Sequence, residues 1–319
     1  MFRKEVPQYQ MTAWLLTALS APIIQTAGHT GWVSTALAAV LVIPLCWLVN
    51  TYCPRGLPDR AWFCVLEWIA VTAVLAGITA WSEEAWPTGR DFPVVPLTLL
   101  MLAVLSSLKG ASGASRVSSV LFWFAALLYA IILVCGAGEM KLRWMTPSRD
   151  LPSSQVLLIL LLPSGLCLLP REKGKGLSVG IMVTGLLFII VSAWVAGNLP
   201  RKVIADTVWP FYEASKGLAL PGIAGRFESL VSVAATMGYF SLQSMLLSMA
   251  GCVADSLREG WGKAGIIGAA IIAGIYILLF PPVHSSWLVI ITLLGWCILP
   301  LFGAFAGKRK KTKKTENNA

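Results

Sequence analysis

Apolar residues along the chain gather in ten stretches, which short polar segments separate. Most stretches are long enough to cross a hydrocarbon core of about 30 Å as an α-helix, which rises about 1.5 Å per residue. The expected spans are residues 8–27, 32–50, 61–81, 93–108, 117–136, 155–170, 177–197, 229–253, 264–281 and 287–306. The pattern therefore predicts an all-α polytopic membrane protein, with ten transmembrane helices in a single domain at residues 1–307.

The composition agrees with a membrane protein. Hydrophobic residues make up 57% of the chain and charged residues 13%, and the mean hydropathy is +0.75. An ordinary soluble domain carries about 25% charged residues, so the composition excludes that class. The first stretch meets the second through only residues 28–31, without the cleavage site of a secretory signal, and we interpret it as a retained span.

The basic residues predict how the chain lies in the membrane. Most of the 25 lysines and arginines fall on the side of the ten expected spans that also holds both chain ends. Because cytoplasmic loops carry the excess of basic residues, both termini are expected in the cytoplasm. Much of the net charge of +10 lies in a basic tail at residues 308–319, so the charge does not indicate a nucleic-acid partner. The tail is either an orientation signal or a contact for anionic membrane lipids.

Two of the expected spans contain helix-breaking residues at corresponding places. Ten spans divide into halves of five, about residues 8–136 and 155–306, and an odd number per half inverts the second half relative to the first. Such inverted repeats place a binding site at interrupted helices. The first span has Ser20-Ala21-Pro22 near its middle, and the sixth has Pro163-Ser164-Gly165. The pattern predicts that helices 1 and 6 are broken.

A break of this kind has a chemical consequence at bilayer depth. Proline removes a backbone donor and displaces a carbonyl one turn earlier. The freed groups cannot face lipid, so they lie inside protein or line a polar cavity, where they can hold a carboxylate or a cation. A proline kink with no binding role remains the alternative.

Polar residues inside the spans are few. Glu67 is the only carboxylate well inside a span, and charge in hydrocarbon is costly, so it is expected to face the bundle interior. It is either a coupling or gating residue or a structural group that reaches toward the interface. In the eighth span, hydroxyl residues including Thr236 and Tyr239 either face a cavity or join neighbouring helices.

Two further features bear on function. Within the polar segment before the eighth span, residues 198–230, the stretch "FYEASKGLALPGIAGRF" is expected to form short interfacial helices around Gly217 and Pro221-Gly222. They either act as a lid or pack on the surface. The seven cysteines have no metal-like spacing, and His29 and His284 lie in expected external loops. We therefore predict no cofactor, no metal site and no enzymatic activity.

Three stretches carry a resemblance to a known family. They are the stretch with Gln10 and "GHTGWVSTALAAV", the sixth-span "GLCLLPREKGKG", and "VWPFYEASKGLALPGIAGRFESLVSVAATMGYF". Together they resemble the B-subunit permeases of endospore germinant receptors, the GerAB-like family of the amino acid–polyamine–organocation superfamily. The resemblance implies a LeuT-type fold of 5+5 helices, with a small-molecule site between helices 1, 3, 6 and 8.

The family also implies partners and site residues. Its members recognise a nutrient, often an amino acid, and act with an A-type membrane subunit and a C-type lipoprotein in the inner membrane of spores. Many members carry a glutamate where this chain has Cys167, a difference that bears on ligands with an ammonium group. The implied substrate-binding residues are Ser20, Ala21, Pro22, Gln25, Thr26, Ser164, Gly165, Cys167, Thr236 and Tyr239.

Three classes of function remain at this point. A germinant receptor subunit comes first because the resemblance is to that branch. A stand-alone proton- or sodium-coupled amino-acid permease has the same expected architecture. A membrane enzyme comes third, since the sequence shows no nucleophile, metal cluster or phosphate loop.

Overall fold

The computed structural model describes residues 4–29, 31–53, 61–84, 93–145, 151–172, 174–218, 227–280 and 285–302. The basic tail at residues 308–319, His284 and the Pro221-Gly222 part of the external segment lie outside the described residues. The elements are α1 (Gln8–Thr26), α2 (Trp32–Tyr52), α3 (Ala61–Glu84), α4 (Val94–Ser107), α5 (Ala111–Ala137), η1 (Leu142–Trp144), α6 (Ser154–Leu161), η2 (Leu162–Leu168), α7 (Gly176–Asn198), α8 (Arg201–Asp206), α9 (Pro210–Lys216), α10 (Phe227–Leu257), α11 (Gly262–Leu279), α12 (Ser285–Thr292) and η3 (Leu293–Ile298).

Seven helices among the described residues are long and apolar enough to cross a membrane. They are α2, α3, α5, α7, α10, α11 and the continuous segment formed by α12 and η3. The segments α4 and α6–η2 are apolar but shorter, and the 19-residue α1 carries polar residues such as Gln10, Thr17 and Gln25. The chain is an integral multi-pass membrane protein. The count of ten spans, the inverted repeat and the cytoplasmic termini stay predictions.

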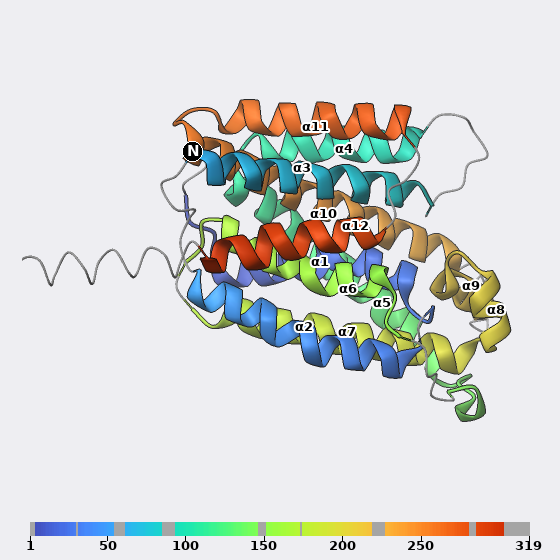
Figure 1. The fold of residues 1–319 in the computed structure, drawn as a ribbon. Helices are drawn as coiled ribbons and strands as arrows, with labels where there is room; N and C mark the ends of the chain where they lie inside the picture. The colour runs from blue at the N-terminus through green and yellow to red at the C-terminus, as the bar shows by residue number, and fades with distance from the viewer. Residues whose placement is uncertain are drawn as a thin grey trace, which may run out of the picture.

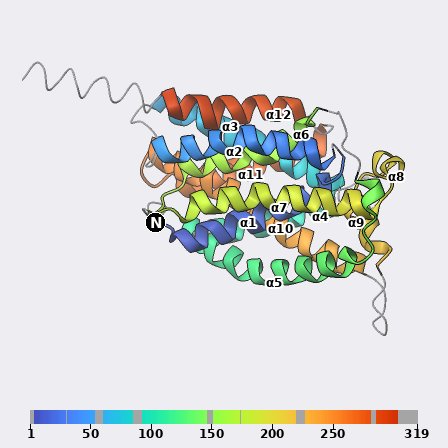
Figure 2. The same cartoon turned by 90° about the horizontal axis from the view of Figure 1, so that it is seen from below.

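The helices α1 and α10 form the centre of the bundle. α1 packs against α10, α5 and α7, while α10 also packs against α3, α4 and α11. Figure 1 shows α11, α4 and α3 on one side of this centre and α2 and α7 on the other. In the view from below, α1 lies between α7 and α5 (Figure 2). Figure 1 also shows α8 and α9 together at the end of the bundle opposite the N-terminus.

Short glycine turns reverse the chain between successive spans. Gly28 (φ 97°) and Gly31 (φ 75°) lie between α1 and α2 in a backbone region that residues with a side chain rarely adopt. The two glycines let α2 begin at Trp32, soon after α1 ends at Thr26. At the start of α6, Ser153 caps the helix, because its hydroxyl accepts a hydrogen bond from Val156 N at 3.3 Å.

The segment before α1 is tied to the loop between η2 and α7. Val6 N donates to Pro170 O at 3.1 Å, and Glu172 N donates to Val6 O at 3.2 Å. The Gln8 side-chain oxygen accepts a hydrogen bond from Leu177 N at 2.9 Å. The beginning of α1 is thereby fixed to the end of the sixth span and the start of α7.

Candidate functional site

The first helix is not broken. α1 runs without interruption from Gln8 to Thr26, with Pro22 inside it, so the predicted break at Ser20-Ala21-Pro22 is wrong. Pro22 leaves the carbonyl of Ala18, one turn earlier, without its helical donor, and the two nearby hydroxyls bond to other carbonyls of the same helix. Ser20 Oγ donates to Thr17 O at 2.7 Å, and Thr26 Oγ1 donates to Pro22 O at 2.8 Å. Packing of α1 in the bundle centre outweighs the loss of a single backbone bond.

The sixth span does change its helical form where the sequence predicts an interruption. The α-helix ends at Leu161, and a 3₁₀ helix with Pro163 in its first turn continues to Leu168. Side chains of α2 satisfy the carbonyls there. Asn50 Nδ2 donates to Pro163 O at 3.1 Å, and Cys46 Sγ donates to Leu160 O at 3.2 Å. The backbone at this interruption is bound to α2 in the described conformation.

Asn50 has a second partner beyond the interruption. The guanidinium of Arg171, in the loop after η2, donates to Asn50 Oδ1 at 2.6 Å and to Asn50 O at 2.5 Å. Asn50 also donates to Cys46 O within its own helix at 2.9 Å. One side chain therefore joins the last turn of α2, the interrupted sixth span and the following loop.

The predicted site residues of the sixth span pack against the last helix. Ser164 is fully buried and donates to Leu161 O at 2.6 Å. A methyl group at Gly165 would come within 2.6 Å of the Trp296 indole ring. Trp296 lies in η3, a π-helical turn, a form that is frequent at functional sites. Cys167 is also buried. These residues line the junction of η2 and η3, where a side chain at Gly165 would not fit.

Two other predicted residues meet directly in the bundle centre. Tyr239 of α10 donates its hydroxyl hydrogen to Gln25 Oε1 of α1. On the α3 side, Gln25 Nε2 donates to Trp81 O at 3.5 Å, and Gln243 Nε2 donates to Thr79 Oγ1 at 3.5 Å. All five side chains are buried. We call Gln25, Thr79, Trp81, Tyr239 and Gln243 the polar layer.

The polar layer has an unused acceptor. Gln243 Oε1 is buried and has no hydrogen-bond partner among the described residues. Leaving a buried carbonyl unpaired costs about 1–3 kcal/mol, and protein encloses this oxygen in the described conformation. The layer joins helices 1, 3 and 8 of the expected count, which are three of the four that the sequence resemblance implies for the site.

The remaining predicted residues of helices 1 and 8 serve packing. A methyl group at Gly238 would lie 2.6 Å from Ala21 Cβ and 2.8 Å from Ser20 Oγ, so the bare glycine lets α1 and α10 approach closely. Thr236 Oγ1 donates to Ser232 O of its own helix at 2.8 Å. Thr26 is bonded back in the same way. The Gly238 contact brings α1 and α10 together, whereas the hydroxyl bonds of Thr236 and Thr26 stay within their own helices.

Glu67 of α3 is fully buried. Neither of its carboxylate oxygens has a hydrogen-bond partner in the part of the chain that the structure describes. A methyl group at Gly295 of η3 would lie 3.9 Å from Glu67 Oε2, which shows that the carboxylate lies near the π-helical turn. The carboxylate is therefore enclosed by the bundle.

A cavity of about 320 Å³ lies between α1, α5 and α7. Of the predicted binding residues only Ser20 lines it. Tyr129 of α5 also lines the cavity, and its hydroxyl oxygen is buried beside Ser20. Nothing in the sequence distinguishes Tyr129 from the other aromatic residues of the spans. The cavity is therefore a feature that only the packing of three helices reveals.

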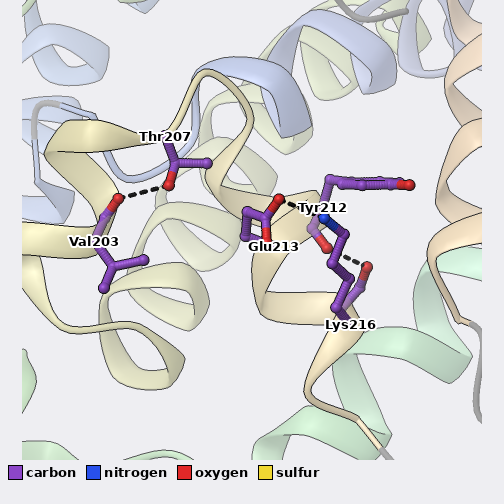
Figure 3. Close-up of polar contacts among 6 residues, drawn as sticks. Val203, Thr207, Tyr212, Glu213 and Lys216 are labelled. Atoms are coloured by element: carbon purple, nitrogen blue, oxygen red, sulfur yellow. Dashed lines mark hydrogen bonds and ion pairs between the residues drawn. The ribbon is translucent and has the colours of Figure 1, made fainter.

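The external segment contains two short helices, α8 and α9, and α9 ends next to Gly217, where the sequence predicts a short helix. Thr207 Oγ1 donates to Val203 O at 2.6 Å in α8, and Lys216 Nζ pairs with Glu213 Oε1 at 2.6 Å in α9. Figure 3 shows both contacts, with Tyr212 beside Lys216. The ion pair with Glu213 raises the pKa of Lys216, but both side chains are exposed, so the pair contributes little to stability.

Phe211 attaches this external segment to the bundle. Its side chain is fully buried, its ring centroid lies 4.9 Å from that of Trp194 and 6.3 Å from that of Tyr129, and it lines the cavity. The segment is anchored by an aromatic side chain that closes one part of the cavity wall. If this external segment moved as a lid, the Phe211 side chain would have to leave its buried position in the bundle.

The fold is similar to that of Mhp1, described as a nucleobase-cation-symport-1 family transporter in a closed conformation with bromovinylhydantoin bound. The similarity covers 92% of this chain and 77% of Mhp1, with a TM-score of 0.57 and 13% sequence identity. The two chains share a fold. No protein-family model and no curated protein matches the sequence.

This likeness supports the LeuT-type class of fold that the sequence predicts. It concerns the arrangement of the helices and does not extend to ligand or partners. The resemblance to the GerAB-like family stays a prediction.

Proposed function

We propose that the protein binds a small solute inside its helical bundle, as a transporter or as a sensor built on a transporter fold. The observation that carries this proposal is the polar layer, which joins α1, α3 and α10 at the centre of the bundle. The fold shared with a symporter over 92% of the chain supports the same conclusion. The buried Gln243 carbonyl is the acceptor that a solute N–H or O–H would meet.

Within this class, we propose a B-subunit-like permease of a nutrient germinant receptor as the specific role. The support is the resemblance of three stretches of the sequence to that family. The solute would be a nutrient such as an amino acid, and the partners would be the A-type membrane subunit and the C-type lipoprotein. The membrane would then be the inner membrane of a spore-forming bacterium.

The second candidate is a stand-alone proton- or sodium-coupled permease. Buried Glu67 favours it, because a carboxylate without a hydrogen-bond partner is suited to take up a proton or pair with a cation. Glu67 lies beside η3 and near its junction with η2. A proton or cation bound by Glu67 would therefore act on the π-helical turn η3 and on the 3₁₀ helix η2 together. We propose Glu67 as the coupling or gating residue.

Uptake by proteoliposomes tests the proposals. Purified protein is reconstituted, and accumulation of labelled amino acids and of a labelled hydantoin is measured with and without proton and sodium gradients. Accumulation driven by a gradient supports the permease and contradicts a pure sensor. Binding without accumulation supports the receptor subunit.

Spores of a strain that lacks the gene provide the second test. Loss of the germination response to one nutrient supports the receptor role, and a complete response to every nutrient contradicts it. If the purified protein neither binds nor accumulates any of the solutes, the general proposal of a solute site in the polar layer is wrong.

A further inference from the structure

The sixth and the last spans are built in the same unusual way. Each begins with an α-helix of eight residues, α6 (Ser154–Leu161) and α12 (Ser285–Thr292), and then changes its helical form. α6 continues as the 3₁₀ helix η2, and α12 continues as the π-helix η3. We call α6 and α12 the paired helices.

The paired helices lie side by side. Figure 1 shows α12 beside α6, and the two helices pack along each other. At their beginnings, the hydroxyls of Ser154 and Ser285 share a hydrogen bond. Beyond their ends, η2 packs on η3, with Gly165 against the Trp296 ring. The two spans are therefore parallel, and both leave the α-helical form at the same level.

This level has the properties of a pivot. A 3₁₀ stretch within a helix often marks a hinge, and π-helical turns are frequent at functional sites. Proline and glycine, here Pro163 and Gly165, are the residues at which helices bend. Asn50 and Cys46 of α2 donate hydrogen bonds to the sixth span at this level. The backbone can therefore bend here while α2 holds its position.

Polar groups at the pivot lack partners. Both carboxylate oxygens of Glu67 and the indole Nε1 of Trp296 are buried, without a hydrogen-bond partner among the described residues. Glu67 lies beside Gly295, the neighbour of Trp296 in η3. A buried donor or acceptor without a partner is costly. An unpaired acceptor and an unpaired donor at one turn favour a second arrangement of the junction.

α12 also packs on α3. Leu288 of α12 is buried against Gly77 of α3, where a Cβ atom would lie 2.5 Å from Leu288 Cδ1. The absent side chain at Gly77 lets the two helices approach closely. This contact joins the paired helices to the rest of the bundle, so it would have to separate if they moved.

We propose that the paired helices move as one gate, which pivots at η2 and η3 and separates from α3 at Leu288. The hydrogen bond between Ser154 and Ser285 makes the two helices move together. The inference goes beyond the proposed function, because it concerns the motion of two spans and holds whether or not the polar layer binds a solute.

A disulfide between α12 and α3 tests the gate. Gly77→Cys with Leu288→Cys suits a disulfide, because a Cβ at Gly77 would lie 3.1 Å from Leu288 Cγ and the Cβ atoms of a disulfide are about 3.5–4.5 Å apart. Of the seven native cysteines, five are buried and two are half-buried. They stay in place, and wild type carried through the same oxidation with copper phenanthroline corrects for them.

Hydrogen–deuterium exchange of the detergent-purified protein gives the measurement. Opening of the gate exposes backbone amides at the pivot, so peptides covering residues 162–168 and 293–298 should exchange faster than residues 239–247 in the centre of α10. The disulfide between α3 and α12 should slow exchange about tenfold or more in both pivot segments. The slower exchange in η2 is the diagnostic result, because the disulfide does not touch the sixth span.

Ser154→Cys with Ser285→Cys is the matched control. This disulfide joins the paired helices to each other at the position of the hydrogen bond. It leaves the gate free to pivot, so exchange in both segments should match that of the reduced variant. Equal slowing by the two disulfides would show that a cross-link acts only by stiffening the helices, and would overturn the gate.

Other results would also overturn the proposal. Slower exchange confined to residues 293–298 would show that α12 moves without α6. Unchanged exchange in both segments would show that the paired helices do not separate from α3. Exchange in wild type as slow as at residues 239–247 would exclude the opening motion. None of these measurements uses a solute, so failed uptake by proteoliposomes would leave them unaffected.

Ser154→Ala tests the pairing without a disulfide. It removes the hydroxyl partner of Ser285 and lets each helix open alone, so exchange in both pivot segments should rise about fivefold. Thr98→Ala is the control, because Thr98 Oγ1 donates to Val94 O of its own helix. If Ser154→Ala leaves exchange at residues 293–298 unchanged, the pairing of the two helices through their serines is wrong.

Discussion

Tyr239 of α10 donates a hydrogen bond to the side-chain oxygen of Gln25 in α1, and this contact joins the two central helices of the bundle. Both residues are buried, and no lipid or solvent can replace either partner. The sequence places them 214 positions apart, so the contact exists only through the packing of α1 on α10.

Removing the Tyr239 hydroxyl tests this contact. Tyr239→Phe leaves Gln25 Oε1 without its donor and should destabilise the protein by about 1–3 kcal/mol, measured as a lower midpoint of thermal unfolding in detergent. In a Gln25→Leu background the same substitution should cost less, because the partner is already absent. Tyr212→Phe is the control, since the Tyr212 ring stacks on Trp209 and keeps that contact. Equal costs in both backgrounds would show that the two residues act independently.

The close approach of Gly165 to Trp296 predicts intolerance to even one methyl group. Gly165→Ala would place Cβ 2.6 Å from the indole ring, and the forced shift should cost about 1–3 kcal/mol. It should also reduce solute binding or uptake if the η2–η3 junction takes part in function. Gly138→Ala is the matched control, because a methyl group there meets nothing within 4 Å. If Gly165→Ala is as stable and as active as Gly138→Ala, the junction tolerates expansion.

Replacing Asn50 by alanine should destabilise the protein more than replacing an asparagine that only bonds back to its own helix. Asn50→Ala removes the donor to Pro163 O and the acceptor of Arg171, and should lower stability by about 1–3 kcal/mol. Asn198→Ala is the comparison, since Asn198 makes the same bond to the carbonyl four residues earlier, at 2.9 Å, as Asn50 does. A similar small loss of thermal stability in both variants would mean that the sixth span does not depend on α2.

Glu67→Gln removes the ionisable carboxylate and keeps nearly the same side-chain volume. The amide is neutral at every pH, whereas the carboxylate carries a charge once it loses its proton. The variant should therefore gain thermal stability relative to wild type as the pH rises, because a buried charge without a partner is costly. It should also lose uptake that depends on a proton gradient. Glu213→Gln is the control at an exposed position, and gradient-driven uptake that survives in Glu67→Gln would exclude coupling through this residue.

Much of the bundle is predictable from the hydrophobic pattern. Spans expected at residues 32–50, 117–136 and 177–197 correspond to α2, α5 and α7, because long apolar stretches have no other stable form in lipid. The interruption at Pro163 is predictable for the same local reason, a missing backbone donor. The break expected at Pro22 is wrong because α1 packs at the centre of the bundle against α10, α5 and α7, and these contacts are not visible in the local sequence.

The candidate site is predictable only in part. Gln25 and Tyr239 were expected to share a site and do meet, whereas Ser164, Gly165 and Cys167 pack at the η2–η3 junction. Gln243 was visible as a polar residue in an apolar span, but its unpaired carbonyl depends on what surrounds it. Tyr129 carries no sequence signal because an aromatic residue in a membrane helix is ordinary.

The sequence by itself determined that this protein spans the membrane many times and that its sixth span changes form at Pro163, since both follow from local hydrophobicity and backbone chemistry. Only the tertiary structure decided which polar groups meet, which one remains unpaired and where a cavity is left. Those features arise from contacts between helices distant in the chain, where the fit of side chains, and not the local preference of any residue, sets the free energy.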